Sequence, residues 1–313
     1  MRQIFIFALA GILLSGGVSS AQSKKFPKGI EHVIVIGIDG LSTDGVLNAH
    51  NPVMKKMISD GAVKRKVRTV LISDSSPNWA SMIAGAGPEQ HGVTTNGWER
   101  DKHTLPPVVA DEEGIFPTIF EVVHRNKPKA EIGAVYNWDG FGRLFEKSAV
   151  NYDATFSTAD STTDTFIRYV SEKKPLFGFI HMDHVDHAGH KYGHGSAEYY
   201  AAVANADSLI GEILTGIEKA GIMESTLVIV TADHGGKGRG HGGATPEEAQ
   251  ITMIFYGKGV KKGYEIKQPV YTYDLAASIA FCFGITPPYA WIGRPVKSAF
   301  VGFSEPANLF YNE

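Results

Sequence analysis

Short apolar runs recur along this chain, and longer amphipathic stretches separate them. The run HVIVIGI at residues 32–38 and the run TLVIVT at residues 226–231 are clear examples. A continuous apolar run of this length is typical of a strand that is buried on both faces, and its alternation with amphipathic helices is typical of a parallel sheet. The pattern therefore predicts an α/β fold in which a central, mostly parallel sheet has helices on both faces, as a three-layer sandwich.

The same pattern gives the bounds of the expected elements. We expect strands at residues 32–38, 63–72, 131–136, 176–181, 226–231 and 252–256. We expect helices at residues 52–60, 77–84, 116–125, 162–172, 197–220 and 273–283. The polar segment 97–113 is expected to run over the surface. No repeat, low-complexity tract or linker divides the chain, so residues 22–313 are expected to form a single domain.

The first residues have the composition of an export signal. One early cation precedes an apolar run from residue 4 to residue 14, and small residues follow it. We therefore expect residues 1–21 to be a signal peptide and the protein to be periplasmic or secreted. The apolar run is shorter than the roughly 20 residues of a membrane-spanning helix, so we expect no stable membrane partner. Cys282 is the only cysteine, which excludes a disulfide within the chain, and we expect a buried thiol.

The charge balance also excludes some partners. The formal net charge is −3, and the cations are scattered, so we expect no binding of duplex nucleic acid. The run Lys64-Arg65-Lys66 is interpreted as a solvated strand edge rather than a binding patch. The sequence does not specify the oligomeric state.

Acidic and imidazole side chains follow several of the expected strands. The carboxyl ends of parallel strands meet at one edge of a sheet, where chemistry usually gathers. Divalent metals bind carboxylate oxygens and imidazole nitrogens, and such sites are often assembled from different strand ends. Each residue alone is equally compatible with a helix cap, a turn or a structural histidine. The set together predicts a metal site, formed by Asp39, Asp186, His190, Asp233, His234 and His241.

The stretch TADHGGKGRGHGG, residues 231–243, is almost entirely glycine and cation around its acidic and imidazole groups. Glycine allows tight backbone turns. We expect a hairpin that returns His241 to the cluster from which Asp233 and His234 project. The alternative is a mobile surface loop, which leaves the two histidines unexplained.

Four segments together resemble the alkaline phosphatase superfamily, in particular its nucleotide pyrophosphatase/phosphodiesterase branch. They are IGIDG, SDSSPNWASMIAGAGPEQHGVTTN, DHVDHAGHKYG and TADHGG, between about residues 32 and 243. The resemblance implies an alkaline-phosphatase-like catalytic domain over residues 22–313, a small-molecule phosphate ester as substrate, and two divalent metal ions, with zinc favoured. It assigns Asp186, His190 and His241 to one ion. It assigns Asp39, Asp233, His234 and the nucleophile to the other.

The resemblance places the nucleophile two residues before a proline, which is Ser75 before Pro77. Pro77 independently suits a first helical turn, whose free amides favour an anionic oxygen. Ser76 competes as the helix N-cap, and both roles are compatible. Asn96 has the spacing from Ser75 at which this branch carries an amide that binds a phosphate oxygen. By itself, Asn96-Gly97 predicts only a turn.

Neighbouring positions refine this interpretation. Sulfatases of this superfamily carry an arginine two residues after the proline. Trp79 stands at that position here, and sulfatase activity is therefore disfavoured. Three further histidines, His181, His184 and His187, are interpreted as supporting or exposed groups. Asp183 is interpreted as a group that orients a ligand imidazole. Four residues after another expected strand could form a wall of the substrate site, although the aromatic ones are equally compatible with the hydrophobic core. They are Tyr136, Trp138, Phe141 and Arg143.

We therefore predict a phosphodiesterase that works through a covalent intermediate on Ser75. The alternatives are a phosphomonoesterase or a phosphotransferase with the same core, and a non-catalytic metal-dependent binding protein, which the intact nucleophile disfavours. The loop VYNWDG at residues 135–140 carries no cation, and this favours a diester over a doubly charged monoester. Arg143 is the one nearby cation that a bend of the chain would return to the phosphate.

Overall fold

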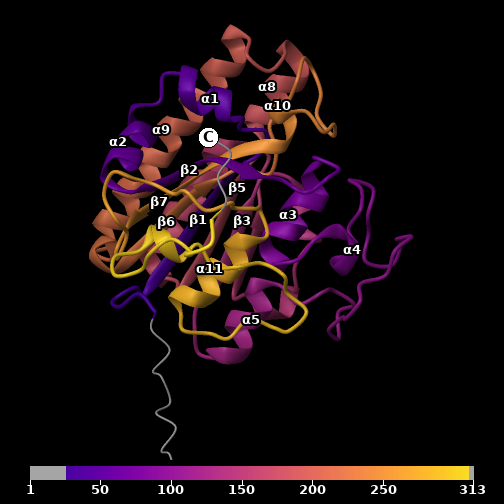
Figure 1. Cartoon of the computed structure of the whole chain (residues 1–313), viewed down its shortest axis with the longest axis vertical. Coiled ribbons are helices and arrows are strands. Elements are labelled where there is room, and N and C mark those ends of the chain that lie inside the picture. Colours follow the sequence, from indigo (N-terminus) through magenta and orange to yellow (C-terminus); the bar gives the residue numbers. More distant parts are fainter. Residues whose placement is uncertain (1–25, 310–313) are drawn as a thin grey trace, which may run out of the picture.

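The structure is a computed structural model that describes residues 26–309. The predicted signal peptide at residues 1–21 lies outside the described residues. An eight-stranded sheet forms the centre of the molecule, with strand order β4-β3-β5-β1-β6-β7-β2-β8 (Figure 1). The strands are β1 His32–Ile38, β2 Ala62–Arg68, β3 Ile132–Tyr136, β4 Tyr152–Thr155, β5 Phe177–Met182, β6 Thr226–Thr231, β7 Gln250–Gly257 and β8 Tyr264–Glu265.

The sheet is mostly parallel, as the sequence predicts. Strands β4, β3, β5, β1 and β6 pair in parallel, and β8 pairs in parallel with β2. Strand β7 is antiparallel to both β6 and β2, so it alone runs against the other described strands. Strands β1, β5 and β6 lie side by side at the centre, and their side chains are almost all buried. Their carboxyl ends therefore meet at one edge.

Helices cover both faces of the sheet, which confirms the three-layer arrangement. One layer contains α1 Thr43–Asn48, α2 Pro52–Asp60, α7 Ala159–Lys173 and α9 Ala197–Lys219, in which α9 packs against the other three. The other layer contains α3 Ser75–Ala84, α5 Ile119–Asn126 and α11 Asp274–Cys282, which pack on one another (Figure 1). Shorter helices are α4 Pro88–His91, α6 Asp139–Gly142, α8 His184–Tyr192 and α10 Pro246–Ala249.

The predicted bounds agree best where an apolar run is continuous. Predicted elements 32–38, 52–60 and 226–231 match β1, α2 and β6 in full. The predicted strand 63–72 is too long, because β2 ends at Arg68 and the next residues form the loop into α3. Strand β4 was not predicted, because its side chains alternate between half-buried and exposed at the sheet edge. Helix α8 was also missed, since its sequence is dominated by histidine, acid and glycine.

Two further observations concern Cys282 and the helices of the fold. Cys282 is 2 % exposed at the end of α11, as a buried thiol should be. Within residues 26–309, no helix combines the length and the apolar character needed to cross a bilayer.

Candidate metal centre and nucleophile

All six predicted ligands lie at the carboxyl edge of the central strands. Asp39 directly follows β1, and Asp233 with His234 follows β6. The pairing of Ile38 with Met182 and of Gly37 with Thr231 aligns the ends of β1, β5 and β6. Helix α8 begins after β5 and carries two further candidate ligands, Asp186 and His190. The strand register therefore brings together groups that are far apart in the sequence.

In one half of the site, the imidazole of His234 contacts the other three candidate groups. Its Nε2 lies 3.1 Å from Ser75 Oγ, 3.3 Å from Asp39 Oδ1 and 3.3 Å from Asp233 Oδ2. Its Nδ1 lies 2.8 Å from the Gly235 carbonyl oxygen, which only accepts, so Nδ1 carries the hydrogen. Nε2 consequently has a free lone pair that points at two carboxylates and a hydroxyl.

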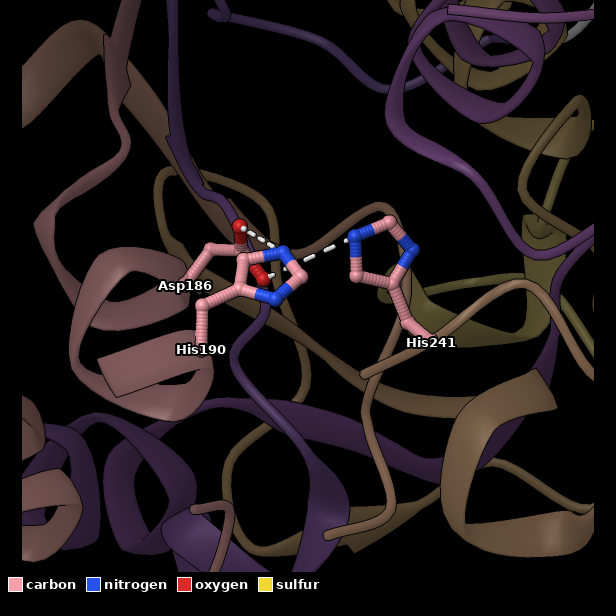
Figure 2. Close-up of side chains that lie close together, drawn as sticks. All are labelled: Asp186, His190 and His241. Carbon is pink, nitrogen blue, oxygen red and sulfur yellow. Dashed lines mark ion pairs between the residues drawn. The ribbon is translucent and has the colours of Figure 1, made fainter. Parts of the chain in front are cut away.

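The other half contains Asp186, His190 and His241 (Figure 2). His190 Nε2 lies 3.2 Å from Asp186 Oδ2, and His241 Nε2 lies 3.9 Å from Asp186 Oδ1. The Nδ1 atoms of the two rings lie against the carbonyl oxygens of Arg239 and Ser73, at 2.9 and 3.2 Å. Metal-binding histidines commonly donate their second nitrogen to a carbonyl in this way. All three imidazoles therefore direct Nε2 toward the carboxylates.

Three carboxylate oxygens in the cluster are buried without a hydrogen-bond donor among the described residues. They are Asp39 Oδ1, Asp186 Oδ1 and Asp233 Oδ2. Burial, and then the negative charge of Asp39, raise the pKa of Asp186 to about 7. The same two causes raise the pKa of Asp233 well above its ordinary value. Divalent cations relieve both the missing donors and the crowding of negative charge, so these residues fit metal ions.

The geometry groups the ligands into two sets of three. The first set is Asp186, His190 and His241, which is also the set that the resemblance implies for one ion. The second set is Asp39, Asp186 and His234, so the carboxylate of Asp186 lies between both sets. Asp233 joins the second set through its contact with His234.

The Asp39 carboxylate is held from behind by two groups. Trp79 Nε1 donates to Asp39 Oδ2 at 3.0 Å, and His181 Nε2 lies 3.2 Å from the same oxygen. Burial acts to raise the pKa of Asp39, but the His181 contact and the neighbouring His234 bring it below the usual range. The interpretation of His181 as a supporting group agrees with this geometry. The role of Trp79 was missed, although its position four residues after Ser75 places both on one face of α3.

The glycine-rich loop is a tight hairpin. Lys237 and Gly240 exchange two backbone hydrogen bonds, at 2.8 and 3.2 Å, and Gly238 has a φ of +58°. A Cβ on Gly236 would lie 2.1 Å from His194 Nε2, so this position has no room for a side chain. The hairpin carries His241 to 3.8 Å from the His234 ring, centroid to centroid.

Ser75 is the first residue of α3 and is 6 % exposed. The N-cap is Asp74, so the expectation that Ser76 caps the helix is wrong. The helix begins two residues earlier than predicted, which puts Ser76 within its first turn. The Ser76 N–H donates to Asn96 Oδ1 at 2.7 Å. This bond orients the Asn96 amide and leaves its NH₂ group as a donor.

Arg143 reaches the start of the same helix. Its Nη2 donates to Ser76 Oγ at 3.2 Å and to the carbonyl oxygen of Asn96, and its Nη1 pairs with Glu99 at 2.5 Å. The chain after β3 therefore does bring a guanidinium next to the candidate nucleophile. Its charge is partly balanced by Glu99.

The remaining candidates divide between core and surface. Tyr136 and Phe141 are 5 % and 0 % exposed and belong to the core. Trp138 instead borders a hollow of about 610 Å³ beside Asp183 and His187. Asp183 contacts His187 Nε2 at 3.5 Å and both amide atoms of Asn137, so it does not orient a ligand imidazole. His184 is mostly buried and is not among the grouped ligands.

Comparisons with known proteins show which proteins this chain is similar to. The family model described as type I phosphodiesterase / nucleotide pyrophosphatase matches residues 33–238. Human bis(5′-adenosyl)-triphosphatase ENPP4 is 24% identical over 248 residues, which cover 75% of this chain and 53% of that protein. The chain thus spans about half the length of the curated relatives it matches.

Solved structures show the same fold. Murine ectonucleotide pyrophosphatase/phosphodiesterase 5 superposes with a TM-score of 0.70 at 16% identity, covering 82% of this chain and 96% of that one. The alkaline phosphatase PafA superposes with a TM-score of 0.72 at 11% identity, covering 88% of this chain and 99% of that one. The central sheet and its two helical layers are therefore those of the alkaline phosphatase fold.

Proposed function

Because the chain belongs to the type I phosphodiesterase / nucleotide pyrophosphatase family, we propose that it is an exported, two-metal hydrolase of phosphodiesters that uses Ser75 as nucleophile. The observation that carries this proposal is the convergence of Ser75 Oγ and two buried carboxylates on the free Nε2 of His234. Export to the periplasm or the medium rests on the sequence of residues 1–21.

The contacts of His234 disfavour a metal-free serine hydrolase. In a Ser-His-Asp triad, the carboxylate binds Nδ1 of the histidine while the serine binds Nε2. Here the carboxylates of Asp39 and Asp233 lie on the same nitrogen as Ser75, and a backbone carbonyl occupies Nδ1. Among residues 26–309, no carboxylate contacts Nδ1 of His234 to stabilise a protonated ring, whereas the arrangement suits a cation between the ligands.

The residues present suggest how two ions would be shared. Asp186, His190 and His241 would hold one ion, and Asp39, Asp233, His234 and Ser75 the other. Mixed carboxylate and imidazole ligands favour zinc. When bound, the two ions would neutralise the charge of the phosphate and favour the ionised form of the serine hydroxyl.

The covalent chemistry then proceeds in two displacements. Ser75 Oγ loses its proton to solvent and bonds to phosphorus, while the bond from phosphorus to one ester oxygen breaks and the departing oxygen takes a proton from water. A water oxygen next bonds to phosphorus, the bond to Ser75 Oγ breaks, and the serine recovers a proton. The Asn96 NH₂ group and the free amides at the start of α3 would donate to the unesterified oxygens throughout.

The second ester group distinguishes a diester from a monoester. Trp138 borders the 610 Å³ hollow and offers a flat apolar surface to such a group. Arg143 is the specific observation in favour of a phosphomonoesterase, since its guanidinium stands beside Ser76 and Asn96. Its pairing with Glu99 reduces the positive charge available to a monoester dianion, so we retain the diester as the substrate.

Turnover of bis-p-nitrophenyl phosphate by the zinc-loaded protein, with two serine variants, tests the proposal. Ser75→Ala should lose activity by at least about a thousandfold while keeping its metal content and fold. Ser76→Ala is the matched control and should retain activity within about tenfold, because it loses only a side-chain contact to Arg143. Equal activity of Ser75→Ala and wild type would exclude the covalent route.

A further inference from the structure

A groove along β2 carries an excess of positive charge. It encloses about 960 Å³ and is bordered by Lys64, Lys66 and Arg68 of β2 and by Lys267 after β8. Glu89 is the one acidic residue among its lining residues. Four cations around one groove are unexpected in a chain whose formal net charge is −3. The groove therefore has a local charge opposite to that of the whole protein.

Strand β2 supplies three of the four cations that border the groove, Lys64, Lys66 and Arg68. Its pairing with β7 is irregular between Lys64 and Val67, so the simple alternation of a regular strand does not apply along this stretch. Arg65 points elsewhere and pairs with Glu265 at 3.2 Å, and Val67 is fully buried. The run Lys64-Arg65-Lys66 is therefore only partly the solvated strand edge that the sequence suggests, because two of its three cations turn into the groove.

The four cations that border the groove form no ion pair within the part of the chain that the structure describes. Lys64 Nζ donates to the carbonyl oxygens of Ile266 and Lys267 at 3.2 and 3.1 Å. Lys66, Arg68 and Lys267 are exposed and form no ion pair with any residue in the range 26–309. The nearby carboxylate of Glu305 is already occupied by the backbone N–H groups of Lys267 and Gln268. An anion entering the groove would thus meet free cations.

A short loop connects the groove to the candidate nucleophile. Strand β2 runs toward the same sheet edge as β1 and β6, and Arg68 is its last residue. Residues 69–71 continue as the groove wall, and Ser75 follows four residues after Leu71. Asn78 ties this loop to α3, because its side chain bonds Val70 N at 2.8 Å and Asp74 O at 3.0 Å. The groove and the start of α3 are therefore held in one fixed arrangement.

The segment that pairs with Arg68 at the end of β2 adds aromatic side chains to the groove. The rings of Tyr271 and Tyr273 stack with their centroids 5.0 Å apart and their planes at 8°. Both tyrosines and Ile292 also border a second hollow of about 450 Å³, which is lined by Asp274 and Arg294 as well. A concave site of this kind suits an extended small ligand with anionic groups better than a flat membrane surface.

We propose that the groove along β2 binds a further phosphate group carried by the substrate, beyond the phosphate that is cleaved. The proposal rests on the proposed phosphodiesterase function, which places the scissile phosphate at Ser75. A substrate with a second phosphate on one of its ester arms would bridge the metal centre and Arg68. Small diesters without that group would use the metal centre alone.

Calorimetry on the zinc-loaded Ser75→Ala protein tests the groove with a matched pair of ligands. Thymidine 3′,5′-bisphosphate should bind about tenfold more tightly than thymidine 5′-monophosphate, because the added phosphate meets several unpaired cations. A Lys66→Gln/Arg68→Gln double substitution in this protein should abolish the difference. Lys262→Gln, which removes an exposed cation outside the groove, should preserve it.

Different outcomes separate the groove from the proposed activity. A tenfold difference that disappears in the double variant supports the groove even if bis-p-nitrophenyl phosphate is not hydrolysed, in which case only the activity fails. Equal affinity for thymidine 3′,5′-bisphosphate and thymidine 5′-monophosphate, or a difference in affinity that survives the double substitution, overturns the proposal that the groove binds a second phosphate. Loss of binding to phosphatidylglycerol vesicles in the double variant, with the nucleotide difference unchanged, would assign these cations to a lipid surface and also overturn the proposal.

Discussion

Trp79→Phe tests whether the hydrogen bond behind Asp39 prepares the metal centre. Trp79 is fully buried on α3, and its Nε1 donates to Asp39 Oδ2 at 3.0 Å. Its ring also packs edge-on against His181, with centroids 4.8 Å apart. Phenylalanine keeps most of this apolar contact and removes the donor, so the substitution acts mainly on the carboxylate.

The expected loss follows from what remains at Asp39. A hydrogen bond to a charged group contributes about 1.5–3 kcal/mol, and groups that orient metal ligands commonly change affinity by about 10- to 100-fold. His181 still contacts the same oxygen at 3.2 Å, so part of the orientation survives. We therefore expect zinc to bind about tenfold more weakly, which corresponds to about 1.4 kcal/mol.

Competition with a chromogenic zinc chelator measures this change, and near-ultraviolet circular dichroism checks the fold. Trp98→Phe is the matched control, because Trp98 is also buried and its Nε1 has no hydrogen-bond partner among the described residues. It should bind zinc as wild type does. Equal zinc affinity in Trp79→Phe and Trp98→Phe would refute the supporting role of Trp79.

Three further predictions concern the ions, the guanidinium and a buried acid. Zinc-loaded wild type should hold about two equivalents per chain and His241→Ala about one; fewer than about one and a half in wild type would contradict the two-ion site. Wild type should have a higher kcat/KM for bis-p-nitrophenyl phosphate than for p-nitrophenyl phosphate, and Arg143→Ala should reduce monoester turnover more than diester turnover. A monoester preference above about tenfold in wild type would overturn the diester assignment. Burial raises the pKa of Glu146 to about 7, so this group favours folding below its unfolded pKa and loses that contribution as the pH rises toward 7. Urea unfolding of wild type and Glu146→Gln should therefore diverge between about pH 4.5 and 7, by up to roughly 3 kcal/mol, and parallel curves would contradict the shift.

The sequence by itself determined the class of fold and which candidate metal ligands gather at the sheet edge. An apolar run and the polar residue that ends it are neighbours in the chain, so β1 with Asp39 and β6 with Asp233 could both be predicted locally. Parallel pairing then implies that these strand ends share an edge. Weakly patterned elements were missed for the same reason, since edge strand β4 has no apolar run and α8 has few apolar residues.

Tertiary structure alone decided how distant side chains meet. Trp79 contacts Asp39 across 40 positions of the chain, and Arg143 reaches Ser76 across 67. Neither contact has a local pattern, because it depends on how α3 packs on the sheet and on how the chain bends after β3. The groove along β2 has the same origin. The sequence shows Lys64 and Lys66 only as part of a short charged run, whereas the irregular pairing of β2 and the packing of residues 267–273 beside it make a concave site from these charges.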